Sequence, residues 1–304
     1  MSAPALALVR VLGVAAAGGL VMAVALGAGT ELGAALADAA GFDGGLPARL
    51  VPAVLVSALA VPPVRWAARR AGRRAAWLGL GGDGAAWARS FLVGVAVTGA
   101  AAALVLGAGT AAGMLSWSRP EPAVLVGFLA SNALVAMLLE ALPEELTLRG
   151  HAWATLRGRL GGRAAALGTV AIFLLVPGAS TVVGALTARL VGRDPDPVGL
   201  APGGQRPVDY LVLLTFFGLA LVAARTAGTP APLWTAIGTH LTFLTVNRIA
   251  LEGEDRRAGW FAVEESPDAV LLVPAYLLVA TAVFAALRRR HTRRRRGVAR
   301  LTAG

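Results

Sequence analysis

The chain of 304 residues is 57% hydrophobic and only 15% charged, and its formal net charge is +11. Because it has no cysteine, disulfides, thiolate metal sites and cysteine nucleophiles are excluded. The arginines stand in short blocks between apolar runs, which is the distribution that the positive-inside rule describes for membrane proteins. The composition therefore predicts an all-α, polytopic membrane protein, and no nucleic-acid partner is expected.

Eight apolar runs are long enough to cross a membrane, which takes about 20 residues. No soluble domain and no internal repeat is evident, so we expect one integral membrane domain over residues 1–304 that ends in a basic tail at 288–304. The first run is expected to be an uncleaved span, because it is too long for a signal peptide. In chain order the expected spans are 5–28, 48–64, 87–110, 122–143, 164–191, 207–226, 230–250 and 268–288.

The arginine blocks predict the orientation of these spans. The basic tail is expected in the cytoplasm, and with eight spans the N-terminus is expected there as well. The acidic segments at 31–43, 194–209 and 252–268 then lie outside. We expect a multi-pass protein of the cell membrane whose tail contacts anionic lipids, with membrane lipids among its partners.

Three glutamates close the fourth apolar run, at positions 140, 144 and 145, and an arginine follows at 149. A charged side chain at membrane depth costs at least about 2.5 kcal/mol unless it is paired or faces water, so such acids are candidates for function. Helical spacing predicts an ion pair between Glu145 and Arg149 and places Glu140 on the face of Glu144. Glu144 is then the carboxylate suited to act as a general base on water. The alternative is that these acids only mark the cytoplasmic end of the span.

The chain has three histidines. His291 lies among the tail arginines and is expected to be solvated, and His151 is expected to face the cytoplasmic interface just after the acidic group. His240 lies inside the seventh apolar run. It either forms a hydrogen bond to a neighbouring helix or joins the glutamates in a site.

The segment Glu144-Glu145-Leu146-Thr147-Leu148-Arg149-Gly150 resembles the Glu-Glu-x-x-x-Arg signature of the CPBP family, which comprises the CAAX proteases and bacteriocin-processing enzymes. The likeness covers roughly residues 122–251. The stretch from Pro232 to His240 is similar to the third motif of that family, in which a helix carries a histidine that joins the glutamates.

The chain departs from the family pattern at two places. The second motif has histidine four residues after phenylalanine, but here Pro177 follows Phe173 at that spacing. The third motif has asparagine four residues after its histidine, and here that residue is Leu244. Asn247 lies two helical turns beyond His240 and is a candidate for lining the same cavity, as is Glu140.

The resemblance implies an intramembrane peptidase that hydrolyses membrane-associated proteins or peptides. In that reading Glu144 activates water, Glu145 and Arg149 form a supporting pair, and His240 polarises the scissile carbonyl or binds a metal. A divalent metal is a candidate cofactor, although Glu144 and His240 do not complete the three-ligand set usual for catalytic zinc.

Two other readings stay open. A catalytically degenerate member of the family would act as a membrane binding or immunity-type protein. A proton-coupled transporter would use the glutamates and His240 as a relay, and it is disfavoured because the sequence shows no paired repeats.

Overall fold

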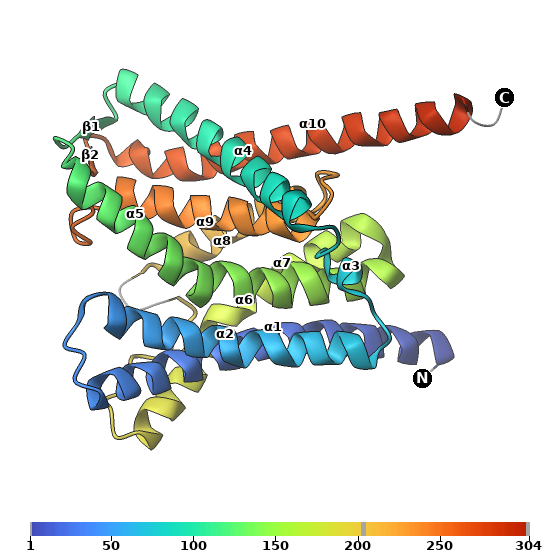
Figure 1. Ribbon diagram of the computed structural model, residues 1–304, viewed down its shortest axis with the longest axis horizontal. Coiled ribbons are helices and arrows are strands. Elements are labelled where there is room, and N and C mark those ends of the chain that lie inside the picture. The colour runs from blue at the N-terminus through green and yellow to red at the C-terminus, as the bar shows by residue number, and fades with distance from the viewer. Residues whose placement is uncertain (1, 202–204, 302–304) are drawn as a thin grey trace. The chain divides into compact units, whose positions relative to one another are not determined.

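The computed structural model describes residues 2–201 and 205–301, with the side chains of residues 3 and 295–301 left aside (Figure 1). The described part is mostly helical and has almost no strands, so the prediction of an all-α polytopic membrane protein is confirmed. The chain divides into two units, each built from two stretches of sequence. Unit 1 comprises Met1–Leu78 and Ser131–Gly218, and unit 2 comprises Gly79–Ala130 and Leu219–Gly304.

Unit 1 is organised around the long helix α1 (Ala3–Ala39), which packs along α2 (Gly45–Arg70) and α7 (Trp153–Leu190) (Figure 1). Glycines on α1 allow the close approach: a Cβ at Gly27 would lie 2.5 Å from the carbonyl oxygen of Ser180 on α7. Small residues at such crossings let helix backbones meet within a membrane. The short helix α3 (Ala75–Leu78) completes the N-terminal stretch.

The second stretch of unit 1 is a nearly continuous helical segment. It begins within α5 (Pro122–Ala136) and continues through the π-helix η1 (Met137–Ala141), α6 (Leu142–Glu144) and the π-helix η2 (Glu145–Ala152) into α7. Gly161 breaks α7 with a φ of 77°, a left-handed conformation that glycine adopts readily. The first part of α8 (Pro207–Arg225) ends the unit.

Unit 2 contains α4 (Gly84–Ala111), α9 (Pro232–Ala250) and α10 (Leu272–Leu301). Helix α4 packs against both α9 and α10. Strands β1 (Leu115–Trp117) and β2 (Ala262–Glu264) form an antiparallel pair with Leu115 opposite Glu264, and the 3-10 helix η3 (Pro267–Leu271) leads into α10. Stacked rings of Trp117 and Trp260, with centroids 4.4 Å apart, lie at the same end of the unit.

Six helices in the described residues are long and apolar enough to cross a membrane. One of them, the stretch Pro122–Leu190, contains the fourth expected span and all but the last residue of the fifth. The seventh expected span corresponds to α9, which is not among the six because threonines, His240, Asn247 and Arg248 lower its mean hydropathy. The number eight therefore stays a prediction, as does the cytoplasmic placement of the basic tail, whose residues 302–304 lie outside the described part.

The crossing of α4 and α9 depends on two glycines. A Cβ at Gly238 would lie 2.3 Å from the carbonyl oxygen of Phe91, and one at Gly94 would lie 2.2 Å from that of Thr235. Both obstacles are backbone atoms, so the helices would have to separate. We expect Gly238→Ala to lower the free energy of unfolding by about 1–3 kcal/mol, as overpacking does.

The measurement is unfolding of the purified protein in detergent, followed by circular dichroism. Gly107→Ala is the matched control, because Gly107 lies on exposed α4 surface with no atom within 4 Å of an added Cβ. Alanine there should be neutral or stabilising by up to about 1 kcal/mol. Equal stability of the two variants would contradict the close crossing.

Candidate active site

The glutamate motif lies on backbone that is wound as π-helix and not as regular α-helix. Pro143 explains part of this, because it offers no N–H to the preceding turn. The N–H of Leu142 donates to the carbonyl of Met137, so the Leu138 carbonyl loses its usual donor. The hydroxyl of Ser57 on α2 donates to Leu138 instead. Single π-turns occur frequently at functional sites because they shift side chains out of the regular helical register.

A second local bond fixes the turn that carries Glu144. The Thr147 hydroxyl donates to the carbonyl oxygens of Pro143 and Glu144, at 2.8 and 3.1 Å. A threonine hydroxyl in this position competes with the backbone N–H groups that would otherwise bond these carbonyls. The eight residues of η2 begin at the next position, Glu145, and carry the rest of the motif.

The predicted ion pair between Glu145 and Arg149 is confirmed. The Arg149 Nη1 atom lies 3.3 Å from the Glu145 Oε1 atom, and both side chains are fully buried. The Arg149 guanidinium also lies over the ring of Phe173 on α7, 4.3 Å from its centroid. The ring face attracts the cation, so Phe173 helps to fix the arginine that holds Glu145.

Glu144 is buried next to this pair, and Glu140 is partly buried in the preceding π-turn. Tyr210, near the start of α8, lies close enough to both carboxylates for their charges to act on its hydroxyl. Tyr210 is not among the site residues predicted from the sequence. The only sequence feature that distinguishes it is its rarity, since the chain has two tyrosines.

Position 177 lies one helical turn beyond the phenylalanine that contacts Arg149. Pro177 is buried inside α7, and its carbonyl accepts a hydrogen bond of 2.8 Å from the Ser180 hydroxyl. The second motif of the family would carry a histidine here. The structure thus places the substituted position on the helix that packs against the glutamate motif.

The remaining predicted site residues belong to unit 2. His240 is buried in α9, with 1% of its surface exposed, two residues after the crossing at Gly238. Asn247 donates its amide to the Tyr276 hydroxyl at 2.9 Å and to the Phe243 carbonyl at 3.0 Å. Asn247 therefore links α9 to α10. Unit 1 brings together Glu140, Glu144, Glu145 and Arg149, and unit 2 holds His240 and Asn247.

The expected positions of the other two histidines were wrong. His151 does not face an interface: it is 8% exposed, with its Nε2 atom 3.1 Å from the carbonyl oxygen of Val14 on α1 and its ring edge-on to Trp77. His291 is not fully solvated but partly buried, and it packs so closely on Gly228 that an added Cβ there would lie 2.7 Å from its ring. In both cases a distant segment covers the ring.

In neither unit does the described donor set fit a resident metal. Within each unit, the described histidine, aspartate and glutamate side chains form no group of three that could hold a metal ion. In the glutamate motif the Glu145 carboxylate is already directed at Arg149.

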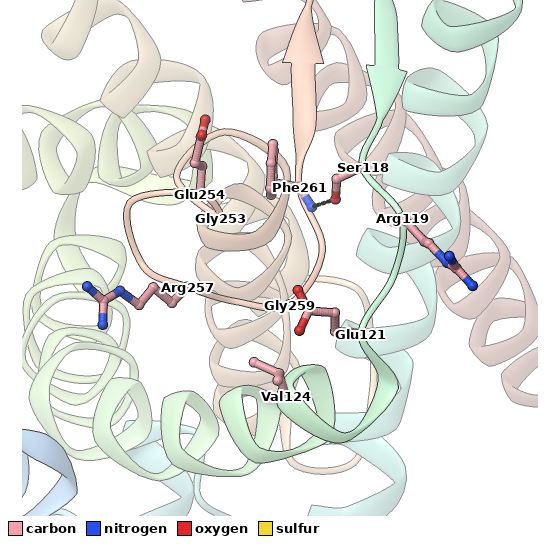
Figure 2. Close-up of a pocket in the computed structure, with 9 residues that line it drawn as sticks. All are labelled: Ser118, Arg119, Glu121, Val124, Gly253, Glu254, Arg257, Gly259 and Phe261. Carbon is pink, nitrogen blue, oxygen red and sulfur yellow. Dashed lines mark hydrogen bonds between the residues drawn. The ribbon is translucent and has the colours of Figure 1, made fainter.

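A hollow of about 490 Å³ in unit 2 lies between the start of α5 and the loop after α9 (Figure 2). The side chains of Arg119 and Arg257 point away from it on opposite sides, while Glu121 lies beside Gly259. The Glu121 N–H donates to the Gly259 carbonyl at 2.7 Å, which closes the loop onto the helix. None of the predicted site residues lines this hollow.

Comparison with known proteins identifies the segment that carries the motifs. Residues 122–246 match the family described as type II CAAX prenyl endopeptidase Rce1-like, a stretch that includes Glu144, Arg149 and His240. A search of curated proteins and one of solved structures each found no match. The match supports an intramembrane endopeptidase kind of function. The resemblance to the CPBP intramembrane proteases is confirmed over this segment, because residues 122–246 match the model of the Rce1-like type II CAAX prenyl endopeptidase family.

Proposed function

We propose that this protein is an intramembrane endopeptidase that cleaves membrane-associated proteins or peptides with water activated by Glu144. The observation that carries the proposal is the burial of Glu144 directly beside the preformed Glu145–Arg149 pair. Two adjacent buried carboxylates are costly at membrane depth. The pair stabilises one of them, and the other retains the chemistry of a base.

In this mechanism the Glu144 carboxylate takes a proton from water while the water oxygen bonds to the scissile carbonyl carbon. The carbonyl oxygen becomes an oxyanion. When the C–N bond breaks, the amine leaves with the proton that Glu144 has held, which returns the carboxylate to its starting state. A positioned general base of this kind contributes about 100- to 10,000-fold in rate.

The supporting roles follow from the contacts in unit 1. Arg149 neutralises Glu145 and is itself fixed by Phe173, so the π-turn keeps its geometry while Glu144 changes charge. For His240 we propose the polarisation of the carbonyl, on the ground of the family resemblance. The site would open to the cytoplasm, with both termini on that side, because the arginine blocks favour that orientation.

A second candidate function is favoured by Pro177. Proline has neither a side-chain donor nor a backbone N–H, so it cannot replace the histidine of the second motif. A chain that lost cleavage with that histidine would be a degenerate family member that binds a membrane protein without hydrolysing it.

The experiment is a cleavage assay with the purified protein in liposomes of mixed zwitterionic and anionic lipid. The probes are membrane-anchored peptides with and without a prenylated C-terminal Cys-aliphatic-aliphatic-X sequence, and mass spectrometry detects the products. Cleavage of either probe by the natural chain supports the peptidase. If only the double variant Pro177→His with Leu244→Asn cleaves, the degenerate reading holds.

A further inference from the structure

The two tyrosines of the chain have different surroundings. Tyr276 is completely buried in unit 2, where its hydroxyl accepts the amide of Asn247. Tyr210 is partly buried in unit 1, and the charged groups that act on its hydroxyl are Glu144 and Glu140. A hydroxyl held near two intramembrane carboxylates is a donor placed at the proposed site of catalysis.

The packing of α8 on α7 explains why Tyr210 lies at this level. The rings of Phe217 and Phe173 meet with centroids 6.1 Å apart, and a Cβ at Gly218 would lie 3.2 Å from Phe173 and from Val170. Phe173 in turn contacts Arg149. The part of α8 around Phe217 is therefore level with Arg149 of the motif.

The loop that precedes α8 lies against α7 just beyond position 177. In the loop before α8, the Gly199 carbonyl accepts the Thr181 hydroxyl at 3.0 Å, and Leu200 lies 3.4 Å from the place of a Cβ at Gly178. The two helices are thus antiparallel. Tyr210 precedes Phe217 by two turns, about 10 Å along the axis, which brings it back to the same face.

These contacts place Tyr210 where the family pattern lacks a donor. Pro177 follows Phe173 by one turn of α7, and Glu144 precedes Arg149 by five residues of the facing segment. All three lie on the same side of the Phe173–Arg149 contact. Pro177 is one turn later on α7, Glu144 is about one turn earlier on the motif, and Tyr210 is two turns before Phe217 on α8.

We propose that Tyr210 is a further catalytic residue of the Glu144 site, and that its hydroxyl stabilises the oxyanion in place of the histidine absent at position 177. The inference rests on the proposed endopeptidase function. Tyr210 would supply the hydrogen-bond donor that is missing because position 177 is proline and not histidine.

The chemistry requires only a hydrogen bond from Tyr210. A tyrosine hydroxyl ordinarily has a pKa of about 10, so it is protonated at neutral pH and can donate. As the water oxygen bonds to the carbonyl carbon and Glu144 takes the water proton, the O–H of Tyr210 donates to the carbonyl oxygen that becomes negative. The tyrosine keeps its proton throughout, and the bond weakens when the carbonyl reforms. Such a bond accelerates the step because it is stronger in the transition state than in the bound substrate.

The test compares Tyr210→Phe with Tyr276→Phe, since each variant removes one buried or partly buried hydroxyl and nothing else. We expect Tyr210→Phe to lower kcat by about 100- to 1,000-fold, the usual effect of deleting one oxyanion donor, with KM and the melting temperature little changed. Tyr276→Phe should affect the melting temperature more than kcat, because its hydroxyl joins α9 to α10.

A rescue experiment separates a donor role from a packing role. Adding Pro177→His to the Tyr210→Phe variant supplies a donor at the position of the family histidine, and it should raise kcat by at least about tenfold. Pro177→Ala in the same background restores the backbone N–H without an imidazole and should give no such gain. Equal effects of histidine and alanine would overturn the inference.

The remaining outcomes distinguish this inference from the proposed function. A Tyr210→Phe enzyme with natural kcat, beside an inactive Glu144→Gln enzyme, would overturn the role of Tyr210 alone. No cleavage by the natural chain would overturn the endopeptidase and the role of Tyr210 together. If Tyr210→Phe fails to fold, fluorotyrosine at position 210 keeps the shape of the ring. If Tyr210 is a donor, the pH at which kcat declines should be lower for the fluorotyrosine protein than for the natural chain, because the fluorinated hydroxyl loses its proton at a lower pH.

Discussion

Glu144→Gln should abolish cleavage of the membrane-anchored peptides, with kcat lowered by about 100- to 10,000-fold. Glutamine has nearly the shape of glutamate but cannot take a proton from water. The Glu145–Arg149 pair does not involve Glu144, so the fold of η2 should persist. Initial rates in liposomes measure the activity, and circular dichroism in detergent checks the helical content and the melting temperature.

Glu31→Gln is the control for the loss of a carboxylate from unit 1. Glu31 lies 3.6 Å from the Arg193 side chain in a partly exposed pair, which contributes at most about 1 kcal/mol. The Glu31 variant should therefore keep the natural rate. Cleavage that survives Glu144→Gln at the natural rate would exclude the glutamate mechanism, and the base would have to be sought elsewhere in the site.

Local spacing and composition were sufficient to predict the fold class and the central ion pair. Apolar runs of about 20 residues indicate membrane helices, because a helix forms all of its backbone hydrogen bonds within its own segment and needs no partner segment in the bilayer. The spacing of Glu145 and Arg149 predicts their contact because residues four apart meet on a helix. Both inferences depend only on neighbouring residues, and both are confirmed.

The ends and irregular turns of the helices were harder to predict, because they depend on hydrogen bonds that other helices supply. The second span was expected to end at residue 64, directly after Pro62-Pro63, but α2 continues through both prolines to Arg70. Membrane helices tolerate proline when neighbouring groups satisfy the freed carbonyls. The same dependence hides the π-helix of the motif, since Ser57 comes from another helix to bond the Leu138 carbonyl.

Residues that act through tertiary contacts could not be predicted from local spacing. His151 stands beside the motif in sequence, yet its burial depends on Val14 and Trp77, which are far from it in the chain. Tyr210 lies 66 positions after Glu144, and only the packing of α8 on α7 brings the two together. Sequence spacing predicts the acidic group of the motif and not Tyr210, the hydroxyl donor that we propose.

Arg149→Met should destabilise the protein strongly, by about 3–5 kcal/mol in the free energy of unfolding. The substitution removes the cation from a pair whose two side chains are fully buried, and it leaves the Glu145 carboxylate in a site of low polarity. It also removes the charge that lies over the Phe173 ring. Unfolding in detergent by denaturant, followed by tryptophan fluorescence, measures the loss.

Arg193→Met is the matched control, because it removes an arginine from partly exposed pairs with Glu31 and Asp38, each of which contributes at most about 1 kcal/mol. The variant Glu145→Gln with Arg149→Met completes a double-mutant cycle. If the large cost of Arg149→Met comes from a stranded carboxylate, neutralising Glu145 should recover much of it, and the two single losses should exceed the double loss. Additive losses would show that Arg149 stabilises the fold through Phe173 and its other neighbours. In that case the pair would not be what keeps η2 in place beside Glu144, and the activity of Glu145→Gln would be expected to match that of the natural chain.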